Sequence, residues 1–564
     1  MVSSRILEIE DLKVIFRTSD SVIHAVDKIS FGLNGSEFLG IAGESGSGKS
    51  VTALSIMKLI PVGPESLTEG HIWLHEGAQK IDLCTASERF MRKIRGKRIS
   101  IVFQEPMTSL NPVHRCGDQV RELLLCHYSI SKKEASSKVL RLFQEVRIPR
   151  PEVIYHAYPH QLSGGQRQRI MIAMAIACDP AVLIADEPTT ALDVTIQKSI
   201  MELLKRLQES RKMSILFITH YIGLIGTYAD RVIMMFRGGI VEQGPLSEVL
   251  QNPIHSYTKG LLACRPRIDI KVKRLITLQE SSEEIQMPVH ESSIKEFEDQ
   301  PIIEAILVSK SFPIPSDKIF RKHTLIPALK PVTIEVFRGE TLGIVGESGS
   351  GKTTLGRVLL KLVPPTSGEI HYKGQNITQL PPEKVRKLRK RMQIIFQDPY
   401  LSLNPRMIIG KALLEPMKIH RLHQSDRQRY KKVIEILGHV GLEPESYYRY
   451  PHEFSGVQRQ RICIARALAV EPELIICDEC VSSLDVSIQA QVLNLLNDLK
   501  QKYNLTYIFI SHDLAVVRHM SDRLIVLKEG AIVEEGLAED IYKNPATEYT
   551  RILIEAIPRI TLHM

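Results

Sequence analysis

The chain has 564 residues, of which 43% are hydrophobic and 24% are charged, and its formal net charge is +9. These proportions are ordinary for a globular protein, and no basic motif with interleaved aromatic residues indicates nucleic-acid binding. No stretch reaches the ~20 apolar residues of a membrane-spanning helix, and residues 1–13 lack the pattern of a signal peptide. The eight cysteines are scattered, which is typical of a reducing compartment. We therefore expect a cytosolic or peripheral protein.

A phosphate-binding loop follows the apolar strand pattern Phe38–Ala42. The next eight residues, from Gly43 to Ser50, match the pattern G-x-x-x-x-G-K-[ST] and precede a helical pattern. Glycines let backbone N–H groups turn inward around a triphosphate, and the N-terminus of the following helix adds positive charge. Ser50 is a candidate Mg²⁺ ligand. The candidate phosphate ligands of this loop are Gly43, Ser45, Gly46, Gly48 and Lys49.

Two further motifs of the first half indicate anion binding and hydrolysis. Residues 162–166 read Leu-Ser-Gly-Gly-Gln before a predicted helix over 167–177, and N–H groups at a helix start form an anion site. The apolar strand pattern Val182–Ala185 then ends in Asp186 and Glu187. An Asp at this place can hold Mg²⁺ through water, and the Glu beside it can deprotonate attacking water. The candidate residues of the helix-start site are Ser163, Gly164, Gly165 and Gln166.

The same motifs return about 292 residues later, as from Ser163 to Ser455. A repeat of this length is too long for a solenoid and indicates two homologous domains. The second phosphate loop offers Gly346, Ser348, Gly349, Gly351, Lys352 and Thr353. The second helix-start site offers Ser455, Gly456 and Gln458, and the second pair of carboxylates is Asp478 and Glu479.

Short apolar strands alternate with helical patterns in both halves, as around Ile215–Ile218 and Tyr507–Ile510. This alternation predicts an α/β fold with mostly parallel sheets, in which each phosphate loop lies at the carboxyl end of its strand. We expect a first domain over residues 1–263, a linker over 264–300 and a second domain over 301–564. The latter half of the linker is polar and acidic.

Together these motifs resemble those of ATP-binding cassette (ABC) proteins. The chain is similar to two fused nucleotide-binding domains of that family over nearly all residues outside the linker. The resemblance implies two P-loop NTPase domains in tandem, each with a helical subdomain that carries the Leu-Ser-Gly-Gly-Gln signature. In the family, each ATP lies between the phosphate loop of one domain and the signature of the other. The implied cofactors are ATP and Mg²⁺.

The resemblance also gives roles to single residues. Glu187 and Glu479 match the catalytic carboxylates of the family, while Ser50, Thr353, Asp186 and Asp478 match its Mg²⁺ site. Gln104 and Gln397 match the Q-loop glutamines, which sense Mg²⁺ and touch the membrane partner. His220 and His512 match the switch histidines at the γ-phosphate, and Asp193 and Asp485 match the D-loop aspartates. Phe16 and Phe312 match the aromatic rings that stack on adenine. Either phenylalanine is also explained as a strand residue of the core.

The Q-loop segments narrow the resemblance. Residues 103–112 and 396–405 resemble those of bacterial oligopeptide, dipeptide and nickel importers, and the tails His255–Leu262 and Glu548–Thr550 match the same group. This implies an ATPase on the cytoplasmic face of the cell membrane that energises import of peptides or similar small solutes. The implied partners are two integral-membrane permease subunits and an extracytoplasmic solute-binding protein, with no nucleic acid.

A soluble tandem-cassette ATPase that acts on ribosomes is the alternative. Such proteins usually carry a long, basic, helical linker between their domains. The segment 264–300 is short and largely acidic, and the paired Q-loops match importers. The sequence therefore favours the importer ATPase.

The chain departs from the family pattern at four places. Val457 stands where the signature has its second glycine; if the turn requires a positive φ, the valine would be strained and the first ATP site impaired. Cys480 replaces the proline after the catalytic Glu, and Tyr221 replaces an aspartate that the second copy keeps as Asp513. Only Cys264 lies where some relatives carry a cysteine-rich segment, so we expect no iron–sulphur cluster.

Overall fold

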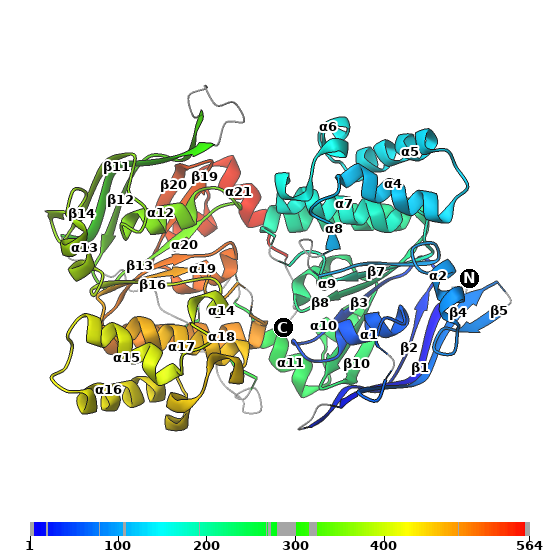
Figure 1. The fold of residues 1–564 in the computed structure, drawn as a ribbon, viewed down its shortest axis with the longest axis horizontal. Coiled ribbons are helices and arrows are strands. Elements are labelled where there is room, and N and C mark those ends of the chain that lie inside the picture. The colour runs from blue at the N-terminus through cyan, green and yellow to red at the C-terminus, as the bar shows by residue number, and fades with distance from the viewer. Residues whose placement is uncertain are drawn as a thin grey trace. The chain divides into compact units, whose positions relative to one another are not determined.

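The computed structural model shows two units, the first built mainly from the chain before Cys264 and the second mainly from the chain after it (Figure 1). Among the described residues, no helix is both long and apolar enough to cross a membrane. The residues that the structure describes are 5–17, 21–61, 63–77, 79–104, 109–190, 192–266, 268, 272–278, 300–314, 324–482 and 484–558.

The central sheet of the first unit has the strand order β10-β9-β3-β8-β7-β6. All its neighbouring strands are parallel except the antiparallel pair β9–β10. Every residue of β3, β7 and β8 is buried, because helices and a second sheet cover the parallel strands on both faces. The strands are β3 (Phe38–Ala42), β6 (Ile99–Val102), β7 (Val182–Asp186), β8 (Ser214–Thr219), β9 (Arg231–Phe236) and β10 (Gly239–Pro245).

A smaller antiparallel sheet with the order β2-β1-β4-β5 completes the β structure of this unit. Its apolar residues alternate with polar ones, so that one face is buried. That face, helix α1 and the central sheet share one apolar core, to which Leu7, Ala53 and Leu39 belong. The strands are β1 (Arg5–Arg17), β2 (Val22–Asn34), β4 (Ser66–Glu76) and β5 (Gln79–Asp82).

The helices of the first unit divide into those beside the sheets and a helical subdomain. Helices α4, α5, α6 and α7 contact one another and form the subdomain, which Figure 1 shows as a separate group in cyan. The helices are α1 (Lys49–Ile56), α2 (Glu88–Ile94), α4 (Cys116–His127), α5 (Lys132–Glu145), α6 (Pro151–His156), α7 (Gly164–Ile176), α8 (Val194–Arg211), α9 (Ile222–Tyr228), α10 (Leu246–Gln251) and α11 (Ser256–Ala263).

The second unit repeats this architecture, with sheets of the orders β16-β17-β18-β13-β19-β20 and β12-β11-β14-β15. The strands are β11 (Pro301–Ile314), β12 (Thr324–Phe337), β13 (Thr341–Val345), β14 (Ser367–Tyr372), β15 (Gln375–Asn376), β16 (Met392–Ile395), β17 (Leu474–Asp478), β18 (Thr506–Ile510), β19 (Arg523–Lys528) and β20 (Ala531–Leu537). The predicted α/β fold with two homologous domains in tandem is confirmed.

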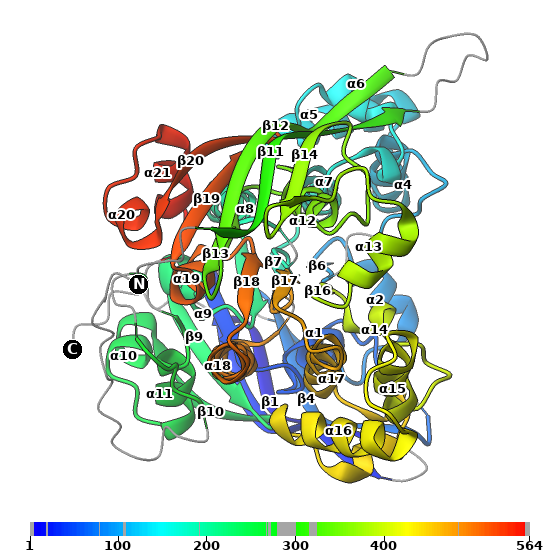
Figure 2. The ribbon, with the colours of Figure 1, turned by 90° about the vertical axis from the view of Figure 1, so that its left-hand side faces the viewer.

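The helices of the second unit also divide into two groups. Figure 2 shows α15, α16 and α17 together at one end of the unit and β11, β12 and β14 at the other. The helices are α12 (Lys352–Leu359), α13 (Pro382–Leu388), α14 (Pro399–Ser402), α15 (Ile409–Ile419), α16 (Asp426–His439), α17 (Gly456–Leu468), α18 (Val486–Tyr503), α19 (Leu514–Met520), α20 (Ala538–Lys543) and α21 (Glu548–Glu555).

Part of the predicted linker packs against the second unit. Leu275 is buried, and its backbone N–H donates to Asn494 Oδ1 at 3.0 Å while Asn494 Nδ2 donates to its carbonyl oxygen at 2.8 Å. Arg274 lies beside Asp498, one turn further along α18, at 3.1 Å. Arg274 and Leu275 therefore hold this part of the predicted linker against α18, although the linker sequence shows little hydrophobic periodicity.

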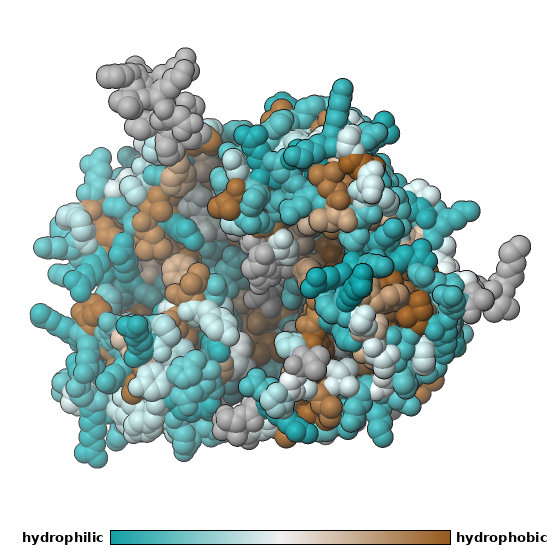
Figure 3. Space-filling view, turned by 45° about the vertical axis from the view of Figure 1, so that its right-hand side comes forward, coloured by the Kyte–Doolittle hydropathy of each residue, from teal (hydrophilic) through white to brown (hydrophobic). Residues whose placement is uncertain are grey.

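On the face that Figure 3 shows, the described residues form no single large apolar patch. Hydrophilic side chains cover most of that face, and apolar residues form separate small patches. Scattered exposed apolar side chains are normal in soluble domains.

The two units differ at the start of the helix after β8 and β18. The Asp513 carboxylate caps α19 by accepting from the backbone N–H groups of Ala515 at 2.9 Å and Val516 at 3.3 Å. Tyr221 occupies the same place before α9 and makes no side-chain cap. The first turn of α9 therefore lacks a bond that α19 has.

We expect Tyr221→Asp to stabilise α9 by about 1 kcal/mol, the usual contribution of an N-cap carboxylate. The backbone at Tyr221 (φ −96°, ψ 88°) is close to that at Asp513 (φ −86°, ψ 104°), so the new side chain fits the cap geometry. Hydrogen exchange of the α9 amides should slow about fivefold. Asp513→Ala is the matched control and should speed exchange in α19. Unchanged exchange in α9 would contradict the prediction.

Candidate nucleotide-binding sites

The first phosphate loop connects β3 to α1 and requires glycine where the chain turns. Gly43 has φ +155°, and a Cβ there would collide with the carbonyl oxygen of Met235. Gly48 has φ +100°, and a Cβ there would collide with the carbonyl oxygen of Ala25. Gly46, at φ +79°, faces open space. The backbone thus enters and leaves the loop in conformations that only glycine adopts without strain.

The lysine and hydroxyl residues of the loop point to its inner side. Lys49 is buried, and its Nζ donates to the carbonyl oxygens of Gly43 and Glu44, both at 2.8 Å. Ser50 Oγ donates to Asp186 Oδ1 at 3.0 Å, which joins α1 to the end of β7. A cation, a hydroxyl and a carboxylate therefore meet beneath the loop.

The second loop, between β13 and α12, has the same geometry. Lys352 Nζ donates to the carbonyl oxygens of Gly346 and Glu347 at 2.8 Å each, and Thr353 Oγ1 donates to Asp478 Oδ1 at 2.9 Å. Burial lowers the pKa of Lys352, although the surrounding carboxylates oppose that shift. Gly346 and Gly351 also have positive φ values, +150° and +103°.

At the ends of β7 and β17, the pKa of the aspartate is raised and the pKa of the glutamate that follows it is lowered. Burial raises the pKa of Asp186 to about 6 and also raises that of Asp478, against the hydroxyl hydrogen bonds of Ser50 and Thr353. The next residues, Glu187 and Glu479, have φ values of +47° and +51°. Their backbone N–H groups donate to Ile218 and Ile510, at 2.9 Å each, so the neighbouring strand fixes this turn.

A histidine and a glutamine hold the carboxylate of Glu187. Gln104 Nε2 donates to Glu187 Oε2 at 2.9 Å, Thr190 Oγ1 donates to the same oxygen at 3.0 Å, and His220 Nδ1 lies 3.0 Å from Oε1. Burial disfavours the charged form, yet His220, Thr190 and Lys49 together keep the pKa of Glu187 below its usual value. Gln104 and His220, which are distant from Glu187 in sequence, thus meet at one carboxylate.

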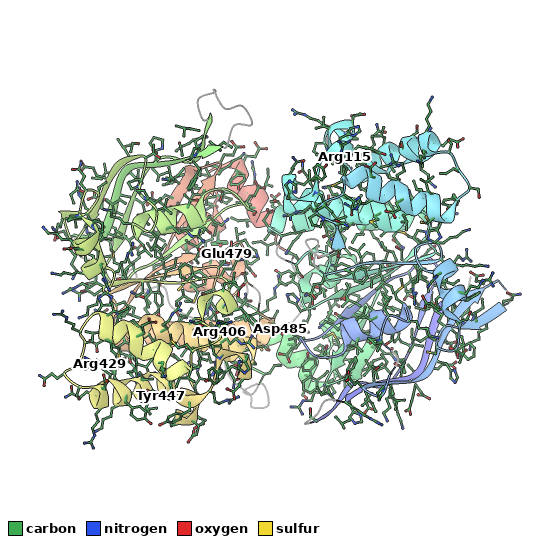
Figure 4. The ribbon with its side chains drawn as sticks, in the orientation of Figure 1. Arg115, Arg406, Arg429, Tyr447, Glu479 and Asp485 are labelled. Carbon is green, nitrogen blue, oxygen red and sulfur yellow. The ribbon has the colours of Figure 1, made fainter. Side chains whose placement is uncertain are left out.

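Glu479 has the matching partners in the second unit. Gln397 Nε2 donates to Glu479 Oε2 at 2.9 Å, and His512 Nδ1 lies 3.4 Å from that oxygen. Burial would lower the pKa of His512, but the Glu479 carboxylate outweighs it and raises that pKa. Figure 4 shows Glu479 and Asp485 on the same side of this unit.

The signature residues start two helices with identical capping boxes. Ser163 Oγ accepts from the backbone N–H of Gln166 at 3.3 Å, and Gln166 Oε1 accepts from the N–H of Ser163 at 3.1 Å. Ser455 and Gln458 make the same two bonds at the start of α17. Each side chain satisfies the backbone N–H of the other residue, so the first turn of each helix is held in place.

Family comparisons agree with this geometry. The family model described as ABC transporter matches residues 26–190 and 329–482, more than half of the chain. The chain belongs to the ABC transporter family. The model described as Oligopeptide/dipeptide transporter, C-terminal region, matches residues 241–290 and 533–563, further along the chain from each ABC transporter match.

Curated relatives match the chain from end to end. The Glutathione import ATP-binding protein GsiA of Salmonella paratyphi A is 46% identical over 99% of this chain and 90% of its own length. The protein of the same name from Escherichia coli K12 is 44% identical over the same shares. Among solved structures, the dimeric structure of MJ0796, a bacterial ABC transporter cassette, is 28% identical and covers 43% of this chain and 98% of its own, with a TM-score of 0.38.

These findings confirm the predicted family, an ABC-type ATPase of the oligopeptide and dipeptide importer group with two fused cassettes. They do not support the ribosome-acting alternative. The predicted ATP-binding and ATP-hydrolysing activity follows from the family. Residues 105–108, in the first of the two Q-loop segments that favoured importers, lie outside the described residues.

The suspected strain at Val457 is wrong. Val457 lies in the first turn of α17 and has a helical backbone rather than a positive φ. Gly165, its counterpart in the first ABC cassette, is helical too. A Cβ at Gly165 would lie 3.0 Å from Ile196 Cγ2, so this glycine makes room for a neighbour rather than for a turn. Helical geometry accepts a valine here, and the backbone gives no reason for a weaker ATP site.

The two predicted adenine-stacking residues lie in equivalent strands with different exposure. Phe16, on β1, is half-buried and packs against the core, and Phe312, on β11, is 41% exposed. Their cross-strand neighbours are Ile23 and Ile326, which are 49% and 50% exposed. This pairing depends on the register of two strands, which the sequence motifs do not contain.

The cysteines around the second pair of carboxylates are packed thiols. Cys477 and Cys480 are both buried, and a hydrogen bond to Cys480 together with burial raises the pKa of Cys477. Among the described residues no group of three or more His, Cys, Asp or Glu side chains is arranged to hold a metal ion. Cys480 therefore takes the place of Pro188 as a small core side chain.

We expect Val457→Gly to change steady-state ATP hydrolysis by less than twofold, because the helical backbone at this position needs no glycine. The measurement is the ATPase rate of the full chain at saturating ATP. Gly165→Val is the matched variant and should lower thermal stability, since Ile196 must move to admit the side chain. A fivefold or larger gain in rate on Val457→Gly would show that the valine side chain itself obstructs the nucleotide.

Proposed function

We propose that this ABC ATPase energises the import of small peptides or peptide-like solutes through separate permease subunits. The single observation that supports this most is the matched pair of oligopeptide/dipeptide C-terminal regions, one after each cassette. The relatives named for glutathione import, over 99% of this chain, point to a solute of tripeptide size. In this proposal the chain is peripheral on the cytoplasmic face of the membrane, with a solute-binding protein outside.

The donor set beneath each phosphate loop fits Mg²⁺. Ser50 Oγ and Asp186 Oδ1, 3.0 Å apart, are the hard oxygen ligands that this ion prefers, as are Thr353 Oγ1 and Asp478 Oδ1. Gln104 and Gln397 complete the proposed set. The bound ion would neutralise charge on the β- and γ-phosphates, while Lys49 and Lys352 would contact the same phosphates from the loop.

Glu187 and Glu479 are the proposed general bases. Each carboxylate is kept ionised by its histidine and can take a proton from the attacking water. Gln104 and Gln397 each donate to one oxygen of the carboxylate. His220 lies beside the other oxygen of Glu187, whereas His512 lies beside the same oxygen of Glu479 that Gln397 contacts. Phe16 and Phe312 remain the proposed adenine contacts.

The segment after Gln397 is the proposed contact with a permease. Tyr400 and Leu401, in the short helix α14, are 65% and 88% exposed. The Asp398 carboxylate accepts from both of their backbone N–H groups, and the Arg459 guanidinium lies 3.7 Å from the Tyr400 ring centroid. A rigid turn thus presents two large apolar side chains to solvent beside the residue that holds Glu479.

We also keep the boundaries 1–263, 264–300 and 301–564 as proposed domain limits.

We expect Glu187→Gln and Glu479→Gln each to abolish most turnover at one site and the double variant to slow ATP hydrolysis ~10²–10⁴-fold, the usual loss on removing a general base. ATP binding should persist in every variant, since the loops are unchanged. Glu415→Gln, at an exposed position of α15, is the control and should have no effect. A double variant with wild-type turnover would remove both residues from the catalytic role.

The transport proposal is tested by reconstitution. The chain and two permease subunits are reconstituted in proteoliposomes together with a solute-binding protein. Uptake of labelled glutathione and of di- and tripeptides is then measured with ATP on the side of the membrane that carries this chain. We expect ATP-dependent uptake of at least one peptide-like solute and none with Glu187→Gln/Glu479→Gln. ATP-dependent movement in the opposite direction, or uptake of none of these solutes, would contradict the proposal.

A further inference from the structure

Each unit ties its phosphate loop to a helix of its C-terminal region through a tyrosine hydroxyl. Tyr257, in the first turn of α11, accepts a hydrogen bond from the backbone N–H of Glu44 at 3.0 Å. Tyr549, in the first turn of α21, accepts one from the backbone N–H of Glu347 at 3.2 Å. Glu44 and Glu347 are the second residues of the two loops, so one contact occurs twice at the same place.

The helices that carry these tyrosines are fixed to the central sheets. In the first unit, the Glu242 carboxylate on β10 accepts from the backbone N–H groups of Ile254 at 2.8 Å and His255 at 3.2 Å. Glu534 on β20 accepts the corresponding pair of bonds at 2.7 and 3.1 Å. Burial disfavours both charges, yet these hydrogen bonds keep the pKa of each carboxyl group below its usual value. The start of each helix that carries a tyrosine is therefore held against the central sheet.

The hydroxyl contact recurs although the support of the ring changes. The Tyr257 ring stacks on Phe236, at the end of β9, with centroids 4.3 Å apart. The matching residue of the second unit is Lys528, whose Nζ lies 4.7 Å from the centroid of the Tyr549 ring. The feature that the two units share is thus the hydrogen bond to the loop rather than the packing of the ring.

The contact holds one peptide of the loop at both of its polar groups. In the peptide between Gly43 and Glu44, the Glu44 N–H donates outward to Tyr257, and the Gly43 carbonyl oxygen accepts from Lys49 Nζ at 2.8 Å on the inner side. The preceding residue, Gly43, is pressed against the backbone of Met235. Any tilt of the Glu44 peptide would therefore also move the lysine that the phosphates need.

We propose that Tyr257 and Tyr549 are positioning residues for the ATP phosphates, and that the C-terminal region of each cassette sets nucleotide affinity through them. The inference rests on the proposed role of these two loops in holding ATP. Loss of the hydroxyl would remove its hydrogen bond to the Glu44 or Glu347 N–H and release the loop from this outer contact. Because the contact is to the loop rather than to Glu187 or Glu479, the effect falls on affinity rather than on hydrolysis of bound ATP.

The test uses Tyr257→Phe, Tyr549→Phe and the double variant in the full chain, since phenylalanine keeps the ring and removes only the hydroxyl. Binding of a non-hydrolysable ATP analogue is measured by calorimetry, and KM and kcat are measured for ATP. We expect each single variant to weaken binding at one site by roughly fivefold, the usual effect of one lost hydrogen bond. The double variant should weaken both sites, with kcat changed less than twofold.

Tyr542→Phe is the matched control. The Tyr542 hydroxyl, on α20, is buried and donates to the carbonyl oxygen of Leu514 at 2.5 Å. This variant should lower the Tm and leave the Kd of the analogue unchanged. A Tyr257→Phe/Tyr549→Phe protein with the wild-type Kd overturns the proposal, whatever its Tm. Wild-type protein that binds no nucleotide would instead contradict the assignment of the loops to ATP.

Discussion

The sites of this protein depend on the parallel pairing of three neighbouring strands in each unit. In the first unit β3, β8 and β7 lie side by side, with Ala42 opposite Thr219 and Asp186 opposite Ile218. Parallel strands end at the same edge of their sheet, so the phosphate loop, the carboxylates and His220 meet there. A slip of one residue would turn Asp186 to the other face and separate it from Ser50.

The sheet also holds strain where the chemistry requires it. Glu187 and Glu479 both have left-handed backbones, which cost on the order of 1–3 kcal/mol for a non-glycine residue. The backbone bonds to Ile218 and Ile510 fix each turn and direct each carboxylate toward its glutamine and histidine. The residue after each Glu differs between the units, proline in one and Cys480 in the other, but the turn is the same. The neighbouring strand therefore determines this geometry, not the following side chain.

Most of the architecture and the first layer of each site could be predicted from sequence. The phosphate loops, the carboxylate pairs and the helix-start serines are local motifs whose spacing is set by a strand, a tight turn and a helix, and these form from short-range preferences. Because the sequence repeats, each of these predictions applied to both halves of the chain. The valine in the second signature was misjudged because a glycine in a motif suggests a special φ, whereas here the position is simply helical. Whether a glycine serves the backbone or a neighbouring side chain depends on packing, which the motif does not contain.

By itself, the sequence determined the family, the two cassettes and which side chains bear charge at each phosphate loop, because those features repeat as contiguous patterns. The contacts between distant groups follow from the fold: Gln104 and His220 contact Glu187, Asn494 contacts the backbone of Leu275, and the hydroxyls of Tyr257 and Tyr549 contact the loops. Each of these contacts spans more than 30 residues of chain. Their partners are chosen by the order of strands in the sheet and by the helices packed on it, and no local pattern encodes that order.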